Sequence, residues 1–414
     1  MIHLEALQAA LHDRIARQLA QHPPQRGSCA VVEAVNRISA EAVLAPLDVP
    51  RHTVSAMDGY ALAQGSDLCD GAVFTVVGQS VAGRPFAGTP EPQQAVRIMT
   101  GAVLPGGCDT VVMQENVQRD GAQMMLSQPA RLGSNIRHQG EEIRAGQPVL
   151  SAGTRLTPAH VSLLSSLGLA EVAVYRPVRV GLLASGDELV AAGQPLDHAG
   201  QIYNSNTPAL LALLRDLPVT LVDCGVLPDA LQPTQEALLA AAAHCDVVVT
   251  SAGVSVGDYD FLTQAITAIG QIEHYKVALK PGKPFVFGCI HQPERPVLYV
   301  GLPGNPLSTF LGAWLVLRPM LWQLAGQAPL SPPLVLQARL TQPIAKRPGR
   351  REFQRARLTC AADGWTVTPF AAQDSHRVLG LAEANALIDL PEACAGVAAG
   401  DWVAVRPLGW GFDL

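Results

Sequence analysis

The sequence predicts a multidomain protein of mixed α/β and β class, with a central doubly wound, mainly parallel α/β domain, a turn-rich β domain in the N-terminal half and a C-terminal β-barrel. Apolar strand-like runs alternate with helical patterns from residue 177 to about residue 328, which is typical of a parallel sheet covered on both faces. The segments 46–140 and 329–414 instead hold short β-prone runs separated by Gly and Pro. The length of 414 residues suggests two to four domains at about 100–200 residues each.

The first element is an amphipathic helix over residues 2–21, which ends before Pro23. A second helix is expected from about Pro158, because Pro favours the first helical position. Residues 1–45 and 141–176 together are predicted to form an elongated linker domain, although the N-terminal helix is free to pack elsewhere. The apolar face of that helix is formed by Leu4, Leu7, Leu11, Ile15 and Leu19.

The remaining elements follow from the same patterns. Residues 46–140 are predicted to form a small, mostly β domain, and Pro332-Pro333 mark a linker at the start of the barrel domain, 329–414. In the α/β domain, 177–328, the expected helices cover 208–217, 233–244, 259–269 and 306–324. The expected strands of this domain are Val178–Ala184, Val219–Asp223, Asp246–Thr250, Glu273–Ala278 and Val297–Val300.

The composition excludes several classes of protein. Charged residues make up 15% and hydrophobic residues 48% of the chain, which is too apolar for a disordered protein. A net charge of −6 argues against a protein that acts by neutralising nucleic-acid phosphates. No apolar run reaches the roughly 18 residues of a membrane span, and the N-terminal segment lacks a signal-type apolar stretch. The eight cysteines form no CxxC pair. We therefore expect a cytoplasmic protein whose partners are neither nucleic acids nor membranes.

Lysines are rare in this chain and they are clustered. Only four of the 29 basic residues are Lys, and Lys276, Lys280 and Lys283 lie within eight residues. In strand geometry Lys276 and Lys280 share one face, and the turn at Pro281-Gly282 brings Lys283 back toward them. Three converging ammonium groups suit a polyanion, because a compact ammonium can contact an oxyanion closely. The alternative is a solvated basic edge strand, the more usual role for lysines.

Three loops follow predicted parallel strands at the edge where such sheets bind ligands. The loop 185–188 offers carboxylates to Mg²⁺ or to the N–H groups of a heterocycle, or it is an acidic turn that opens a helix. The loop 251–260 is rich in Gly and Ser, which suits backbone N–H contacts to a phosphate. The loop 301–306 opens a helix N-terminus to an anion, or it is ordinary helix punctuation.

Further candidates lie outside the α/β domain. Asp58 stands in an Asp-Gly pair, which is most often a hairpin turn. Thr100 is followed by Gly at a predicted strand end, where its hydroxyl could contact an oxyanion, and Glu142 adds an acid near a domain boundary. In the C-terminal part, Ser375 lies in a turn, and a basic stretch contains Arg347, Arg350, Arg351, Arg355 and Arg357.

Taken in order along the chain, these motifs resemble the MoeA family of molybdopterin molybdenumtransferases, which includes the E domain of gephyrin. The resemblance extends over nearly the whole chain and is most specific in GVSVGD (253–258), KPGKP (280–284) and GLPGNP (301–306). The other matching stretches are SAMDGYAL (55–62), RIMTGAVLPGGCDTVVMQE (97–115), GSNIRHQGEEI (133–143), ASGDEL (184–189), GQIYNSN (200–206) and the FQR and SH elements (353–355, 375–376).

The resemblance implies an elongated homodimer of four-domain subunits whose α/β domain is of the molybdopterin-binding type. It implies a reaction in which adenylylated molybdopterin and molybdate give molybdenum cofactor and AMP, with Mg²⁺ as cofactor. Lysines and backbone N–H groups would offset the charge of these substrates, and Mg²⁺ would polarise the phosphoanhydride. A molybdopterin adenylyltransferase and downstream cofactor-maturation proteins are the implied protein partners.

Motif positions carry the implied roles onto individual residues. The implied catalytic residues are Asp58, Thr100, Glu188, Lys276 and Lys280. The implied substrate-binding residues are Ser251, Gly253, Ser255, Gly257, Asp260, Lys283, Pro303, Gly304, Asn305, Pro306, Ser375 and Arg350 or Arg355. The implied ligands of Mg²⁺ or molybdate are Asp58, Glu142, Glu188 and Asp229. The sequence departs from the family pattern at Glu142, where Asp is usual, at Ala252, where Gly is usual, and at Ala230, where a second Asp is usual.

Two other functions remain open from the sequence. A molybdopterin adenylyltransferase shares the α/β domain, but it would not need the 176 residues that precede that domain here. A non-catalytic scaffold of the gephyrin E-domain type would not need the lysines and carboxylates. Tungstate is nearly the same size and charge as molybdate, so either metal fits. Because Asp58 and Thr100 lie far in sequence from the α/β loops, we expect the site to be shared between two subunits.

Overall fold

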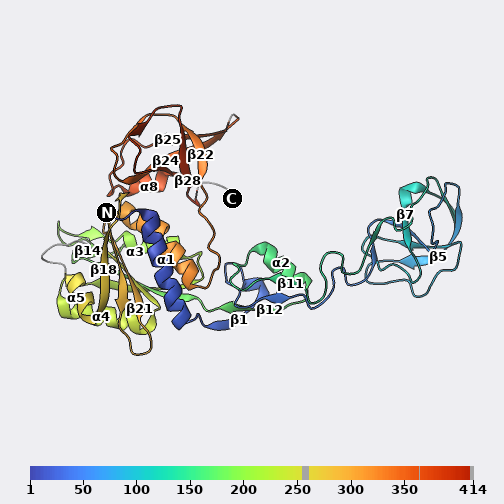
Figure 1. Ribbon diagram of the computed structural model, residues 1–414, viewed down its shortest axis with the longest axis horizontal. Helices are drawn as coiled ribbons and strands as arrows, with labels where there is room; N and C mark the ends of the chain where they lie inside the picture. Colours follow the sequence, from blue (N-terminus) through green and yellow to red (C-terminus); the bar gives the residue numbers. More distant parts are fainter. Residues whose placement is uncertain (254–260, 363, 411–414) are drawn as a thin grey trace. The chain divides into compact units, whose positions relative to one another are not determined.

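The computed structural model describes residues 1–253, 261–362 and 364–410, and Figure 1 colours the chain along the sequence. Contacts within the chain define two compact units. The first comprises Met1–Ala40, Ala152–Pro158 and Glu171–Leu414, and the second comprises Glu41–Ser151 and Ala159–Ala170. The four-domain division expected from the sequence is finer than these two units and stays a prediction.

A six-stranded sheet forms the centre of the first unit, in the order β16-β13-β17-β21-β20-β18. The four strands at one side of this order are parallel, whereas β20 and β18 are antiparallel to their neighbours. The sheet is therefore mainly parallel, as the sequence predicts. Its strands are β13 (Val178–Ser185), β16 (Val219–Leu227), β17 (Val247–Ser251), β18 (Gly270–Lys276), β20 (Pro284–Ile290) and β21 (Val297–Leu302).

Helices cover both faces of this sheet, so the domain is doubly wound (Figure 1). Side chains alternate along each strand. Val180 and Val249 pack with the core that includes α3, α6 and α7, whereas Leu183 and Val248 pack with the core that includes α4 and α5. The helices are α3 (Asn206–Leu214), α4 (Leu231–His244), α5 (Phe261–Ile269), α6 (Pro306–Gly312), a π-helical turn (Ala313–Leu317) and α7 (Arg318–Leu324).

The lysine segment differs from the expected basic strand. Lys276 ends β18 in the central sheet, but Lys280 belongs to β19 (Leu279–Lys280), which pairs in parallel with a strand of the C-terminal region. The two residues therefore do not share a strand face, and that part of the sequence prediction is wrong. The turn at Pro281-Gly282 does bring the chain back, because the Val277 amide donates to the Lys283 carbonyl at 2.8 Å. The reason for the error is that β18 ends at Lys276, and the next strand, β19, pairs with residues more than seventy positions further along the chain, which a local pattern does not show.

The N-terminal helix α1 (Leu4–Gln21) packs on the α/β core of the first unit. Its fully buried side chains are Leu4, Leu7, Leu11 and Ile15, at the positions expected from the periodicity. Figure 1 shows α1 in blue beside the central sheet. No helix in the described part of the chain is long and apolar enough to cross a membrane.

The C-terminal region is a closed five-stranded barrel, as expected. Its order is β24-β25-β22-β28-β26, and pairing between β26 and β24 closes it. Strand β19 of the lysine segment adds to the barrel beside the start of β24. The elements are β22 (Leu336–Leu340), β23 (Ile344–Ala345), β24 (Arg351–Ala361), β25 (Gly364–Pro369), α8 (Val378–Glu383), β26 (Ala386–Leu390), β27 (Gly396–Val397) and β28 (Trp402–Pro407).

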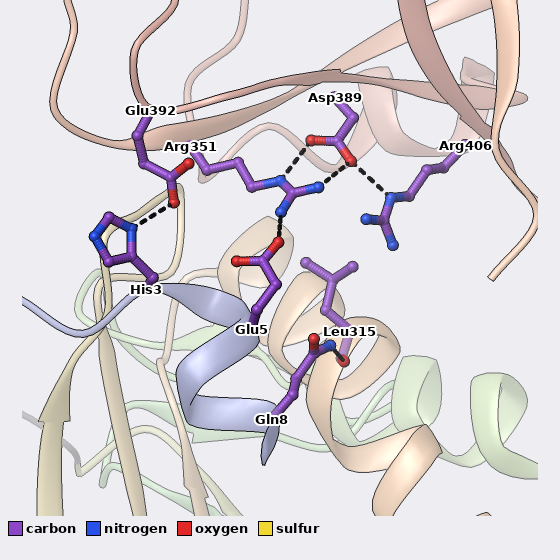
Figure 2. A network of polar contacts seen from close by, with 8 residues as sticks. All are labelled: His3, Glu5, Gln8, Leu315, Arg351, Asp389, Glu392 and Arg406. Carbon is purple, nitrogen blue, oxygen red and sulfur yellow. Dashed lines mark hydrogen bonds and ion pairs between the residues drawn. The ribbon is translucent and has the colours of Figure 1, made fainter. Parts of the chain in front are cut away.

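A charged network attaches α1 to the barrel (Figure 2). Arg351 donates to both carboxylate oxygens of Asp389, at 2.6 and 2.8 Å, and it also pairs with Glu5 of α1. Arg406 donates to Asp389 at 2.8 Å. Asp389 is only 4% exposed in its side chain, so two guanidinium groups share one buried carboxylate. This network connects three barrel strands, β24, β26 and β28, to the helix that packs on the α/β core.

Two smaller contacts of the N-terminal segment lie beside this network, one to the barrel and one to the α/β core. The His3 ring lies 3.1 Å from the Glu392 carboxylate, and Gln8 of α1 donates to the Leu315 carbonyl at 2.7 Å (Figure 2). The neighbours of Arg351 behave differently, because Arg350 and Glu352 line cavities instead of contacting α1. Adjacent residues at the start of β24 thus have different roles, with Arg351 in contact with α1 and Glu352 lining the cavities.

The second unit contains a six-stranded sheet in the order β7-β4-β6-β5-β9-β8, which matches the mostly β domain expected there. Its strands are β4 (Gly59–Leu62), β5 (Val73–Ser80), β6 (Gln94–Ile98), β7 (Thr110–Met113), β8 (Val117–Asp120) and β9 (Gln123–Leu126). The remaining elements of the chain are short: β1 (Arg26–Ala30), β2 (Val43–Leu44), β3 (Val54–Ser55), β10 (Ile136–Arg137), β11 (Pro148–Leu150), α2 (Pro158–Ser166), β12 (Glu171–Tyr175), β14 (Leu189–Val190), β15 (Ile202–Tyr203) and the 3₁₀ turns Val31–Glu33 and Gln114–Asn116.

Candidate active site

A cavity of about 540 Å³, here called the lysine cavity, lies between the α/β layer and the barrel in the first unit. The α/β layer contributes the turn Lys280–Pro284 and the start of α6. The barrel contributes Arg350, Glu352 and the loop 373–376. Six residues proposed from the sequence line it: Lys280, Lys283, Pro303, Asn305, Arg350 and Ser375.

The charged groups of the lysine cavity are mostly cationic. Lys280 donates to the Glu352 carboxylate at 3.1 Å, and that carboxylate is only 9% exposed and also accepts from Gln354 at 2.9 Å. Within the described residues, the side chains of Lys283 and Arg350 have neither a hydrogen bond nor an ion pair. A second lining carboxylate, Asp374, pairs with Arg377 at 3.1 Å. The cavity therefore presents two unpaired cations, Lys283 and Arg350, and a third, Lys280, that the buried Glu352 carboxylate holds in place. Such a surface suits an anion with several oxygens.

Lys276 does not line the lysine cavity. It is exposed at the end of β18, opposite Pro284. Its backbone carbonyl accepts from the Ile2 amide at 2.9 Å, so this end of β18 is joined to the N-terminus of the chain. The structure thus brings together two of the three clustered lysines and leaves the third outside the cavity wall.

Arg350 and Arg355 have different surroundings, which resolves an alternative that the sequence left open. Arg350 is half-buried and lines the cavity. Arg355 is 0% exposed, and its guanidinium donates to the carbonyls of Arg377 at 2.5 Å, Ala372 at 2.9 Å and Asp374 at 3.1 Å. A substrate contact for Arg355 is therefore a wrong expectation, because its donors hold the backbone of the loop that carries Ser375.

The loop with Ser375 is tied to the α/β layer. The Leu307 amide, in the first turn of α6, donates to the Ser375 carbonyl at 3.0 Å. Asn305 precedes this helix as its N-cap residue and makes no side-chain capping bond, and Pro306 is the first helical residue. The Asn305 side chain is therefore not used by the helix that it precedes. The start of α6 and the barrel loop form one continuous wall of the cavity.

The glycine-rich strand-end loop is only partly described. Ser251 is buried at the end of β17, and Ala252 and Gly253 follow with φ values of 79° and 68°. Ala252 therefore adopts the left-handed conformation that glycine adopts without strain. A Cβ placed on Gly304 would lie 3.1 Å from the Ala252 Cβ, so the two loops approach closely there. Ser255, Gly257 and Asp260 lie outside the described residues.

The two carboxylates of the first unit that the sequence proposes as metal ligands, Glu188 and Asp229, follow the ends of two neighbouring strands, β13 and β16. Glu188 is exposed, and its carboxylate folds back over Gly186, whose φ is 135° and where a Cβ would collide with it. The Asp229 amide donates to the Asp187 carboxylate at 3.1 Å, which joins the two strand-end loops. In residues 1–253, 261–362 and 364–410, no group of three or more His, Cys, Asp or Glu side chains is arranged to hold a metal ion.

In the second unit, Asp58 and Thr100 contact each other. One carboxylate oxygen of Asp58 accepts from the Thr100 amide at 2.7 Å and from the Thr100 hydroxyl at 2.8 Å. These two hydrogen bonds hold the pKa of Asp58 below its usual range. The Thr100 hydroxyl thus donates to Asp58 rather than to an open position. Glu142 is 61% exposed and lies 3.6 Å from Arg137.

Sequence reasoning missed two charged residues of the cavity wall, Asp374 in the loop 373–376 and the buried Glu352. Glu352 stands next to the basic stretch and follows no Gly-rich loop, so nothing in the local pattern distinguishes it from a surface acid. Its low exposure depends on the pairing of β24 with β19.

A larger cavity, of about 740 Å³, lies between α1, α7 and the segment 330–334, and none of the residues proposed from the sequence lines it.

The chain was compared with known families, curated proteins and solved structures. Three family models match it: a MoeA N-terminal region (domain I and II) over residues 3–168, a probable molybdopterin binding domain over residues 181–323, and a MoeA C-terminal region (domain IV) over residues 337–408. The molybdopterin molybdenumtransferase of Haemophilus influenzae is 39% identical over 388 residues, which cover 93% of this chain and 94% of that protein. The enzyme of the same name from Synechococcus elongatus is 34% identical over 410 residues, covering 97% and 99%.

A solved structure agrees with these relatives. A molybdopterin biosynthesis MoeA protein from Pyrococcus horikoshii superimposes with a TM-score of 0.78 at 27% sequence identity. The match covers 99% of this chain and 100% of that one.

Proposed function

The chain belongs to the MoeA family of molybdopterin molybdenumtransferases and so acts in molybdenum cofactor biosynthesis. We propose that its lysine cavity binds the anionic oxygens of adenylylated molybdopterin and of molybdate. In the proposed reaction, molybdenum is inserted into molybdopterin and AMP is released. The observation that carries this proposal is the set of cations around the cavity. Lys283 and Arg350 are unpaired within the described chain, and Lys280 is held by Glu352. Both substrates are anions, and fixed cations in a partly enclosed site bind them strongly.

Each wall has its own role in this proposal. Lys280, Lys283 and Arg350 bind and orient the anionic oxygens, and Ser375 offers a hydroxyl from the barrel loop. The loops that contain Ser251, Gly253, Gly304 and Pro306 lie at the carboxyl ends of β17 and β21, where the ligands of such sheets bind. We assign the pterin-phosphate part of the substrate to this edge. Arg355 supports the site through the loop that it holds, and Lys276 remains a proposed contact outside the described cavity wall.

We also propose Mg²⁺ as the cofactor. Glu188 and Asp229 supply carboxylate oxygens at the ends of adjacent strands, and oxygen ligands are those that Mg²⁺ prefers. The carboxylate oxygens of Glu188 and Asp229 are therefore the type of ligand that Mg²⁺ binds. The exposed Glu188 carboxylate has no hydrogen-bond or ion-pair partner among the described residues. Bound Mg²⁺ would polarise the phosphoanhydride of the substrate. Asp58 and Glu142 remain proposed ligands from the second unit.

The proposed assembly is a homodimer. Asp58 and Thr100 belong to the second unit and the lysines to the first, and we propose that Asp58 of one subunit acts with the lysines of the other. An adenylyltransferase partner, downstream maturation proteins and a cytoplasmic location stay predictions. Tungstate remains an equally suitable oxyanion, because its size and charge are nearly those of molybdate.

The experiment that tests this function measures AMP released from adenylylated molybdopterin by the purified chain, with and without molybdate. We expect molybdate-dependent release. The Glu188→Ala variant should melt like the wild type and lose at least about 100-fold in rate, the size typical for removal of one electrostatic contact to the transition state. Glu236→Ala, an exposed carboxylate on α4, is the matched control and should be fully active.

Two outcomes would contradict the proposal. Consumption of ATP in place of AMP release would favour an adenylyltransferase, and unchanged activity of Glu188→Ala would remove that residue from the reaction.

The same assay tests whether the active site is shared between two subunits. Mixing Asp58→Ala subunits with Lys280→Ala subunits should restore part of the activity, and no restoration would mean that each subunit carries its own complete site.

A further inference from the structure

A second cavity, here called the barrel cavity, borders the lysine cavity across Lys280, Arg350 and Glu352. It has a volume of about 410 Å³. Its other lining residues, Ala345–Pro348, precede β24 in the barrel. None of these four residues lines the lysine cavity, and of the four only Arg347 was named from the sequence, as part of the basic stretch. The barrel cavity is therefore a separate feature of the same junction.

The barrel cavity has a strong excess of positive charge. Lys280, Lys346, Arg347 and Arg350 line it, against a single carboxylate, Glu352. That carboxylate already pairs with Lys280 at 3.1 Å. In the described part of the chain, neither Arg347 nor Arg350 has an ion pair or a side-chain hydrogen bond. Three of the four cations are therefore not neutralised by any described carboxylate.

Lys346 is the most informative of these cations, because it is buried. It is 7% exposed, and its ammonium donates to the carbonyls of Cys394 at 3.1 Å, Glu392 at 3.3 Å and Arg347 at 3.4 Å. The three carbonyls satisfy its three donors, yet they do not cancel its charge. A buried charge without a counter-ion is costly, and an anion bound nearby would lower that cost. Lys346 is also the only lysine outside the 276–283 cluster, and the structure places it in a cavity with a member of that cluster.

We propose that the barrel cavity is a second anion subsite, which binds a tetrahedral oxyanion or a phosphoryl group next to the anion held in the lysine cavity. The inference rests on the proposed function, since that reaction brings together two anions, a phosphoanhydride and a metal oxyanion. Arg347 and Arg350 carry the planar donor forks that match such oxygens, and Lys346 supplies a fixed positive charge from below the surface. Lys280 and Arg350 line both cavities and contact both anions. Glu352 fixes the position of the Lys280 ammonium between the two anions.

The test measures molybdate bound per chain at equilibrium, by dialysis of the full-length protein followed by elemental analysis. We expect two molybdate ions per wild-type chain. Arg347→Gln should keep one ion and bind the other at least about tenfold more weakly, the effect of losing one charge-assisted contact. Lys283→Gln should weaken the other ion instead. Arg339→Gln is the matched control, because Arg339 is an exposed barrel arginine outside both cavities, and it should bind two ions like the wild type.

AMP identifies the source of the second anion. AMP is added to the wild-type chain with both molybdate ions bound. If AMP displaces the ion whose binding depends on Arg347, the barrel cavity takes a phosphoryl group. If that ion stays bound, the barrel cavity takes the metal oxyanion. Lys346→Met is a second variant, interpreted only when its melting temperature matches the wild type. Binding of one ion by the wild type, or equal binding by Arg347→Gln and Arg339→Gln, overturns the subsite. Molybdate-dependent AMP release in the assay above would still stand in that case, so the two proposals fail separately.

Discussion

The two walls of the lysine cavity serve one purpose but are supported differently. The α/β wall depends on backbone conformation: Gly282 has a φ of 100°, Ala252 and Gly253 are left-handed, and Gly304 approaches Ala252 closely. The barrel wall depends on buried charges, with Arg355 donating to three carbonyls and Asp389 accepting from two arginines. Substitutions in the barrel wall should therefore cost much stability, and substitutions in the α/β wall should cost little and act locally.

The largest effect is expected for Arg355→Met. Methionine would leave the carbonyls of Ala372, Asp374 and Arg377 without their buried donor, at about 1–3 kcal/mol for each unsatisfied group. We expect the free energy of unfolding to fall by at least about 3 kcal/mol, measured by urea denaturation. Arg357→Met is the control, because Arg357 is exposed on the same strand, and its loss should change stability by less than about 0.5 kcal/mol. Similar unfolding midpoints for the two variants would contradict the buried-charge support of this wall.

A smaller effect is expected at the junction with α1. Asp389→Asn would leave Arg351 and Arg406 without their shared buried charge, and breaking such a pair costs about 3–5 kcal/mol when it is fully buried. Because both arginines reach some solvent, with 15% and 11% exposure, we expect about 2–3 kcal/mol. Glu5→Gln removes the outer partner of Arg351, a carboxylate that is 63% exposed, and should cost under about 1 kcal/mol. Thermal melting of the two variants measures the difference, and a larger loss from Glu5→Gln would reverse our ranking of the contacts.

The same contrast explains what the sequence could predict. Local patterns located the parallel strands, the helices and the loops after β17 and β21, because apolar runs and glycines act within a few residues. They could not show that Lys280 leaves the central sheet for the barrel, since that pairing joins β19 to residues more than seventy positions away. They also could not separate Arg350 from Arg355. Both belong to one basic stretch, and only the fold of the loop 372–377 over β24 buries the second.

The smallest expected effect is at Ala252, and its sign is informative. A left-handed conformation costs an L-residue roughly 1–2 kcal/mol, whereas the extra freedom of glycine in the unfolded chain costs about 0.5–1 kcal/mol. With a φ of 79° at Ala252, we expect Ala252→Gly to raise the free energy of unfolding by about 0.5–1 kcal/mol, measured by urea denaturation. Ala240→Gly, an exposed position in α4, should instead lower it by about 1 kcal/mol.

Destabilisation by Ala252→Gly would mean that the Ala252 methyl group is needed where it packs against Gly304. The α/β wall would then depend on side-chain packing, and the contrast between the walls would weaken. A stabilised variant with slower AMP release would carry a different meaning. The strained backbone at Ala252 would then be part of how this chain positions its strand-end loop, which is a role that glycine would not supply, because glycine adopts this conformation without strain.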